Sequence, residues 1–186
     1  MKPLRNSRYV LALDPSGSYK EGMGTTGWCL YDIEKQKIAK FGFIDANKYS
    51  CQFQYWDAHL TLIDSLEGYH PDLAVEDYLL YGARAEAQIN SRLETPQLLG
   101  ILKYESWKRG TYIHLQTAAQ VKTRWSNNIL LNKGLIEKDG LGYKINGIKV
   151  SDHILDSVRH ALHYAMYTSN FRRNNDRRNY DNRLNK

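Results

Sequence analysis

An apolar run that ends in a carboxylate occurs twice in this sequence, and it limits the possible folds more than any other pattern. Residues 9–13 (YVLAL) lead into Asp14, and residues 72–75 (DLAV) lead into Glu76. Runs of this kind suit strands that are covered on both faces of a sheet. Pro15 cannot extend a central strand, so the first strand ends where its carboxylate stands. If the two strands are parallel neighbours, both carboxylates lie at the carboxyl edge of the sheet, where open α/β sheets place their sites.

The remaining pattern predicts an α/β fold with a mixed five-stranded sheet. Apolar runs at 26–31 and 38–44 follow the first strand closely, so the first three strands are expected to form an antiparallel meander. Helical spacing of apolar residues predicts helices on both faces of this sheet. The expected helices span 54–69, 85–108 (interrupted at Pro96, with Thr95 as a cap), 117–125, 126–135 and a last one from Ser151, with a fifth strand at 112–116. Asn146-Gly147 between isoleucines predicts a hairpin.

Length and composition indicate one domain without a membrane span. The chain has 186 residues, and it contains no apolar stretch long enough to cross a bilayer. The basic start of the sequence lacks the apolar segment of a secretory signal, so we expect a cytosolic protein. Cys29 and Cys51 have no metal-site spacing and are expected to be ordinary side chains.

The net charge of +6 is concentrated near the end of the sequence. Residues 171–186 carry six basic and two acidic side chains among many asparagines. We therefore expect a folded domain at 1–168 and a disordered or marginally helical tail at 169–186. The tail is either a solubilising segment or a polyanion-binding one.

A third group of chemically active side chains begins the last predicted helix. Asp152, His153 and Asp156 lie within one turn, so the pairs 152/156 and 153/156 share a side of the helix. With Asp14 and Glu76 they form an acidic set drawn from separate elements. Two hard divalent cations require several oxygen ligands that converge in this way, and two-metal phosphoryl transfer is the chemistry that uses them.

These motifs resemble the RuvC-type Holliday junction resolvases of the RNase H-like superfamily. The matching segments lie between residues 9 and 167, in the order LALDPSG, TTGWCLYD, LAVED, AAQVK and DHILDSVRHAL. The resemblance implies a nuclease with an RNase H-like fold that acts as a homodimer and nicks a four-way junction symmetrically. The helical segment 98–107 would then form the dimer interface. A longer first loop and the hairpin depart from the bacterial enzymes and indicate a phage-encoded or divergent branch in a bacterial cytoplasm.

The resemblance also implies roles for individual residues. Asp14, Glu76 and Asp156 match the three carboxylates, and His153 matches a fourth position, for which Asp152 competes. The implied cofactors are two Mg²⁺ ions per site, with Mn²⁺ as a substitute because a histidine ligand is softer than a carboxylate. No nucleotide cofactor is expected. The side chains that we expect to contact DNA are Tyr78, Leu79, Tyr81, Arg84, Lys122, Arg124, Lys144 and Lys149; the first three surround the position of the family's junction wedge.

Three alternatives follow from the same residues. An actin-like or sugar-kinase ATPase needs a second phosphate loop and an adenosine motif, for which a chain of this length has no room, and GxxxxGK[ST] does not occur. A terminase-type or other RNase H-like nuclease would act on different DNA or on RNA–DNA hybrids. A non-catalytic branched-DNA-binding protein would not need its carboxylates to converge, because like charges repel in the absence of a cation.

Overall fold

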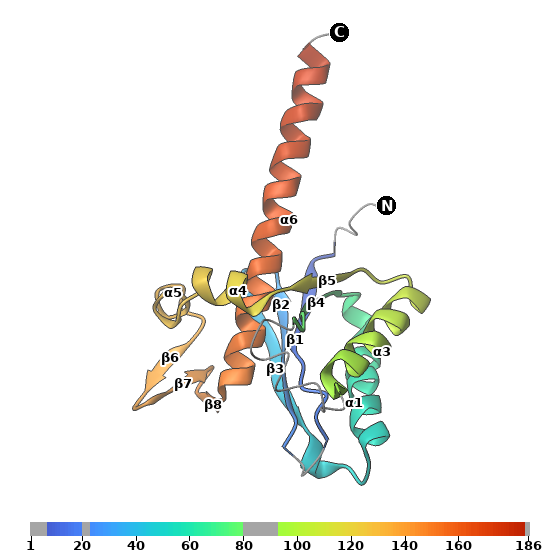
Figure 1. The fold of residues 1–186 in the computed structure, drawn as a ribbon. Coiled ribbons are helices and arrows are strands. Elements are labelled where there is room, and N and C mark those ends of the chain that lie inside the picture. The colour runs from blue at the N-terminus through green and yellow to red at the C-terminus, as the bar shows by residue number, and fades with distance from the viewer. Residues whose placement is uncertain (1–6, 20–22, 80–92, 185–186) are drawn as a thin grey trace.

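The five-stranded sheet orders its strands β3-β2-β1-β4-β5 (Figure 1). The structure is a computed structural model that describes residues 7–19, 23–79 and 93–184. The strands of this sheet are β1 (Tyr9–Asp14), β2 (Thr25–Asp32), β3 (Lys37–Asp45), β4 (Asp72–Glu76) and β5 (Ile113–Gln116). Strands β1, β2 and β3 form an antiparallel meander, and β4 and β5 run parallel to β1. The predicted mixed sheet and meander are confirmed.

The pairing register places the predicted carboxylates at one edge. Leu13 pairs with Val75, so Asp14 and Glu76, the next residue on each strand, end neighbouring parallel strands. Glu76 is in turn the register partner of Gln116, the last residue of β5. Three polar side chains thus end three adjacent strands.

Helices cover both faces of the sheet, as predicted. On one face, α1 (Gln52–Ser65) and α3 (Glu94–Lys108) pack over Leu11, Leu13 and Val75. The other face is covered by α4 (Ala118–Arg124), α5 (Asn127–Asn132) and the first part of α6 (Asp152–Leu184), which pack over Val10 and Ala12. Because the side chains of β1 alternate between these two cores, and all four of Val10–Leu13 are fully buried, β1 is the central strand of the molecule.

Several helix boundaries differ from the prediction, and α5, which was expected to reach residue 135, ends at Asn132. Helix α1 ends at Ser65, and a separate 3₁₀ turn, η3, follows at Glu67–Tyr69. Helix α3 has Leu93 rather than Thr95 as its N-cap, so the predicted Thr95 cap is wrong. The Thr95 hydroxyl instead accepts a hydrogen bond at 3.0 Å from the backbone N–H of Gly17, which belongs to the loop after β1. The predicted helical segment 85–92 lies outside the described residues.

The predicted hairpin is part of a small second sheet formed by β6 (Glu137–Asp139), β7 (Gly142–Ile145) and β8 (Ile148–Val150). Asn146 and Gly147 form its tip with φ of 50° and 76°, the two positive values of a type I′ turn. This sheet lies beside the N-terminal end of α6 (Figure 1).

Helix α6 extends well beyond the sheet, as Figure 1 shows, and its backbone is helical through the basic segment as far as Leu184. The expected boundary between a domain at 1–168 and a tail at 169–186 stays a prediction. Among the described residues, no helix is both long and apolar enough to span a membrane.

Candidate active site at the carboxyl edge of the sheet

A glycine lets the start of α6 lie directly on the sheet. Gly27 of β2 pairs with Asp14, and a Cβ atom built on Gly27 would lie 2.1 Å from the carbonyl oxygen of His153. No side chain fits into that space. The first turn of α6 therefore approaches the end of β1 closely enough for its side chains to reach Asp14.

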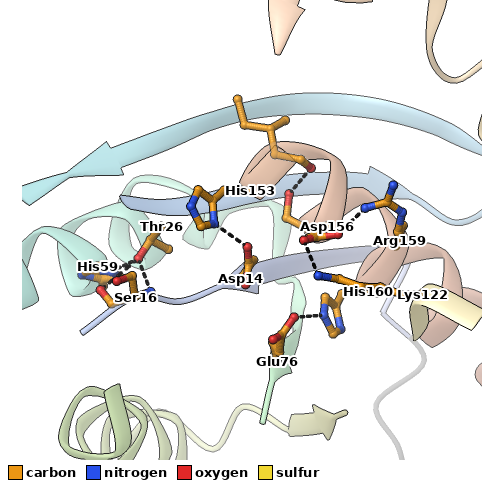
Figure 2. A network of polar contacts seen from close by, with 12 residues as sticks. Asp14, Ser16, Thr26, His59, Glu76, Lys122, His153, Asp156, Arg159 and His160 are labelled. Carbon is orange, nitrogen blue, oxygen red and sulfur yellow. Dashed lines mark hydrogen bonds and ion pairs between the residues drawn. The ribbon is translucent and has the colours of Figure 1, made fainter. Parts of the chain in front are cut away.

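One stripe of α6 faces the edge of the sheet. His153, Asp156 and His160 are three and four residues apart, which places them on one side of the helix over two turns (Figure 2). His153 Nδ1 lies 2.8 Å from Asp14 Oδ2. The structure thus brings together Asp14, the last residue of β1, and His153, the second residue of α6.

Asp156 stands between two basic side chains. Lys122 Nζ from α4 lies 2.9 Å from Asp156 Oδ2, and Arg159 contacts Asp156 Oδ1 (Figure 2). Arg159 also donates to the backbone oxygen of Trp125 at 3.0 Å and contacts Asn127, so it ties α6 to the α4–α5 connection. Asp156 is therefore held in place from two directions.

Glu76 is held by a residue that sequence reasoning missed. His160 Nε2 lies 2.9 Å from Glu76 Oε2, and His160 Nδ1 lies 2.8 Å from Gln116 Oε1. The imidazole is fully buried. A usable signal was present in the sequence, because His160 follows Asp156 by four residues and so shares its side of the helix.

The carboxylates act on one another electrostatically. Burial raises the pKa of Asp14, the hydrogen bond from His153 opposes that rise, and the charges of Glu76 and Asp156 add to it. The pKa of His153 is raised in turn by its hydrogen bond to Asp14. Likewise, the hydrogen bond to Asp156 raises the pKa of Lys122. The site is thus a coupled cluster of acids and bases, in which each of the three carboxylates has a basic partner.

The donor types of this cluster suit a hard divalent cation. Three carboxylates and one imidazole converge, and the mutual effect of the acids on the pKa of Asp14 is what a cation would relieve. Across the part of the chain that the structure describes, however, no three His, Cys, Asp or Glu side chains are grouped closely enough to hold a metal ion. Several of the oxygens that would bind a cation are engaged by His153, His160, Lys122 and Arg159.

A buried polar network supports the loop that follows Asp14. The Thr26 hydroxyl accepts from the Ser16 backbone N–H at 3.0 Å and lies 2.8 Å from His59 Nε2 (Figure 2). His59 Nδ1 donates to the backbone oxygen of Tyr55 at 2.9 Å, which fixes Nε2 as the acceptor of the Thr26 hydroxyl proton. Burial lowers the pKa of His59 to about 4.

The other predicted site residues are distributed around this edge. Asp152 is exposed in the first turn of α6, one residue before His153. Tyr78 packs partly against the α1–α3 core, and Leu79 is 43% exposed. Tyr81 and Arg84 lie outside the described residues.

The lysine and arginine side chains that were predicted to contact DNA lie in different surroundings. Arg124 is exposed at the end of α4. Lys144 forms an ion pair with Asp139 at 3.0 Å within the small sheet. Lys149 is exposed and lines a groove of about 480 Å³ together with Phe43 and Ile148. These side chains lie on elements next to the site, whereas Lys122 belongs to it.

Comparison with known proteins shows which solved structure has a similar fold. No family model matches the chain, and no curated protein matches it in sequence. Among solved structures, the chain is similar to T. thermophilus RuvC in complex with a Holliday junction substrate, with a TM-score of 0.59 and 19% sequence identity over 87% of this chain and 94% of that one. At this identity the likeness concerns the fold. The chain therefore has the mixed α/β sheet of RuvC and the RNase H-like proteins, and the predicted fold class is confirmed.

Proposed function

We propose that this protein is a metal-dependent endodeoxyribonuclease that resolves four-way or other branched DNA junctions. The observation that carries the proposal is the placement of Asp14, Glu76 and Asp156, from β1, β4 and α6, at the carboxyl edge of the sheet, near enough for the charges of Glu76 and Asp156 to raise the pKa of Asp14. A fold shared with RuvC, whose solved complex contains a Holliday junction substrate, supports it. The sequence identity of 19% leaves activity and substrate to experiment.

The carboxylates would hold the cations, with His153 as the fourth ligand and Asp152 as its competitor. If divalent cations were bound there, the chemistry that they would supply is activation of a water molecule and stabilisation of charge on the leaving oxygen. The side chains themselves orient the site: His153 fixes the rotamer of Asp14, and Lys122 and Arg159 fix that of Asp156. Mg²⁺ is the expected ion, and a histidine ligand makes Mn²⁺ an acceptable substitute.

The DNA-facing side chains form the second part of the proposal. Lys122 is half exposed beside Asp156, so its ammonium group can approach a phosphate next to the carboxylates. Lys149, Arg124 and Leu79 are exposed as well, and we propose that they also contact DNA. Symmetric cleavage of a junction further requires two copies of the site, and we propose a homodimer for that reason.

A second candidate function is supported by a specific contact pattern. Each of the three carboxylates has a basic partner within the protein itself. A non-catalytic branched-DNA-binding protein could keep this arrangement. Metal-dependent cleavage separates the two candidates.

The Asp14→Asn variant tests the nuclease. Cleavage of labelled four-way junctions, flaps, duplexes and RNA–DNA hybrids is measured in Mg²⁺ and in Mn²⁺, and junction binding is measured without metal. The wild type is expected to cleave branched DNA. Asp14→Asn should cleave about 10³-fold more slowly or not at all, because metal ions stabilise transition-state charge by several kcal/mol. Its junction binding should persist.

The matched control is Asp57→Asn, which removes an exposed carboxylate from α1. It should leave cleavage unchanged. Undiminished cleavage by Asp14→Asn would contradict the nuclease proposal. A wild type that binds junctions but nicks none of the substrates in either metal would instead support the binding protein.

A further inference from the structure

Glu76 differs from the other two carboxylates in the burial of its partner, because His160 is more buried than His153, Lys122 or Arg159. Asp14 has the first turn of α6 above it, and Asp156 has two basic side chains beside it. The Glu76 side chain is 24% exposed, and it meets the fully buried imidazole of His160 at 2.9 Å. The most exposed of the three carboxylates is thus supported by a buried imidazole.

His160 connects three elements through two hydrogen bonds. Its Nε2 reaches Glu76 at the end of β4, and its Nδ1 reaches Gln116 at the end of β5 at 2.8 Å. Glu76 and Gln116 are register partners on neighbouring strands, so both side chains leave the sheet on the same side, toward α6. The imidazole contacts both of them, and Figure 2 shows its approach to Glu76.

The chemistry of the three groups defines their roles. A carboxylate only accepts hydrogen bonds, so the imidazole N–H is the donor to Glu76. Gln116 is 2% exposed, and its side-chain oxygen lies 2.8 Å from the opposite ring nitrogen, Nδ1. An imidazole with a partner at each nitrogen is restricted in rotation, and its contact with Oε2 narrows the range of rotamers that Glu76 can adopt.

His160 is buried, whereas His153, the other histidine that contacts the three carboxylates, is not. His153 is half exposed and approaches Asp14 from the solvent side of the helix, where a cation or DNA can reach it. His160 has no exposed surface, so neither substrate nor solvent contacts it. Among the described residues, its contact with the three carboxylates is the one to Glu76.

We propose that His160, fixed by Gln116, is a positioning residue that orients the Glu76 carboxylate for cation binding. The proposal rests on the proposed function only in taking Glu76 as a cation ligand. Partners that orient a ligand from outside the coordination shell change metal affinity by about 10- to 100-fold when they are removed. The same effect is expected here, because a Glu76 released from His160 gains rotamer freedom that binding must remove.

The test compares two replacements of His160 that differ in the donor group. His160→Leu removes the N–H and retains an apolar side chain of similar size. His160→Gln places an amide N–H near the position of Nε2 and so preserves donation to Glu76. Mn²⁺ binding to the full-length protein is measured by titration calorimetry and by the paramagnetic signal of free Mn²⁺, in the absence of DNA. Thermal unfolding without metal is recorded in parallel.

His160→Leu is expected to bind Mn²⁺ about 10- to 100-fold more weakly than the wild type, while His160→Gln stays within about threefold. Gln116→Leu should weaken binding in the same direction. His163→Gln is the control, since it changes a half-buried histidine on the same helix. Where branched DNA is cleaved, His160→Leu should raise the Mn²⁺ concentration that gives half-maximal rate, and the rate should largely recover at saturating Mn²⁺.

Equal Mn²⁺ affinity of the wild type and His160→Leu would overturn the proposal. Equal losses in His160→Leu and His160→Gln would overturn it as well, because a donor-independent effect is a packing effect. The positioning role of His160 can be tested separately from the nuclease function. Mn²⁺ binding that depends on the N–H of His160 supports the positioning role even if no substrate is cleaved. If the protein cleaves DNA but its Mn²⁺ affinity does not change when His160 is replaced, the nuclease function is supported and the positioning role is not.

Discussion

At the scale of single residues, the buried His59 makes the stability of the loop after Asp14 depend on pH. Its hydrogen bonds to Thr26 and Tyr55 use the neutral ring, with Nδ1 donating and Nε2 accepting. Because Thr26 also accepts from the N–H of Ser16, protonation of the ring would disturb the loop that follows Asp14. The pKa of about 4 reflects the cost of charging a buried imidazole.

The sign of the resulting pH dependence follows from linkage. An unfolded histidine binds its proton at a pH near 6.5, and His59 in the folded state does so near 4, so unfolding takes up a proton between these values. Stability should be full above pH 6.5 and fall as the pH decreases toward 4, by at most about 3 kcal/mol. Urea unfolding of His59→Gln between pH 4 and 7 should show a smaller slope than the wild type.

His70→Asn is the control for this measurement, because His70 is exposed and its left-handed backbone, with φ of 46°, tolerates asparagine. It should retain the wild-type slope. Parallel slopes in His59→Gln and the wild type would assign the acid sensitivity to other groups.

At the scale of elements, the contact between α6 and β2 controls whether the site forms. The stripe of His153, Asp156 and His160 reaches the edge of the sheet because Gly27 lacks a side chain. Any side chain there displaces backbone, since the nearest atoms belong to the backbone of His153 and Ile154 rather than to a flexible side chain. This position therefore links the packing of a helix directly to the geometry of the carboxylates.

We expect Gly27→Ala to destabilise the protein by about 1–3 kcal/mol, the usual cost of overpacking. It should also reduce metal-dependent cleavage, because the first turn of α6 must move away from Asp14. Gly100→Ala is the matched control: a Cβ atom added there, inside α3, would meet no neighbouring atom within 4 Å. Alanine there should stabilise the helix by about 0.5–1 kcal/mol. Thermal unfolding and junction cleavage of both variants check this, and normal cleavage by Gly27→Ala would contradict it.

At the scale of the whole molecule, α3 offers a surface for the proposed homodimer. The leucines of segment 98–107, which sequence reasoning assigned to the interface, are largely used within the chain: Leu98, Leu99 and Leu102 are buried in its own core. Tyr104 and Trp107 face outward instead, 59% and 74% exposed, with their rings stacked at 6.0 Å. Exposed aromatic pairs of this kind are typical of interface anchors.

If α3 forms the dimer interface, Trp107→Ala should weaken self-association by at least about fivefold, because truncating an interface anchor costs more than about 1 kcal/mol. Sedimentation equilibrium of the full-length protein measures this. Phe53→Ala removes another highly exposed aromatic, 75% exposed on α1, and should leave association unchanged. A monomeric wild type, or equal association of all three proteins, would exclude an interface centred on Trp107.

Local sequence patterns were enough to predict the sheet, its meander, the hairpin at Asn146-Gly147 and the ends of the strands at Asp14 and Glu76. These features depend on periodicity and on turn residues, which act over a few positions. The same kind of pattern placed His153 and Asp156 on one side of a helix. The predicted start of α3 was less accurate, because the Thr95 hydroxyl binds the backbone N–H of Gly17, which is 78 positions away in the sequence.

The partner that holds each carboxylate, by contrast, depends on the tertiary fold. His160 and Glu76 are separated by 84 residues, and His160 and Gln116 by 44. No local pattern encodes such a contact, because it depends on the register between β4 and β5 and on how closely Gly27 lets α6 approach the sheet. Asp14 could be predicted as the end of a strand, but its setting in a coupled cluster of acids and bases follows from packing.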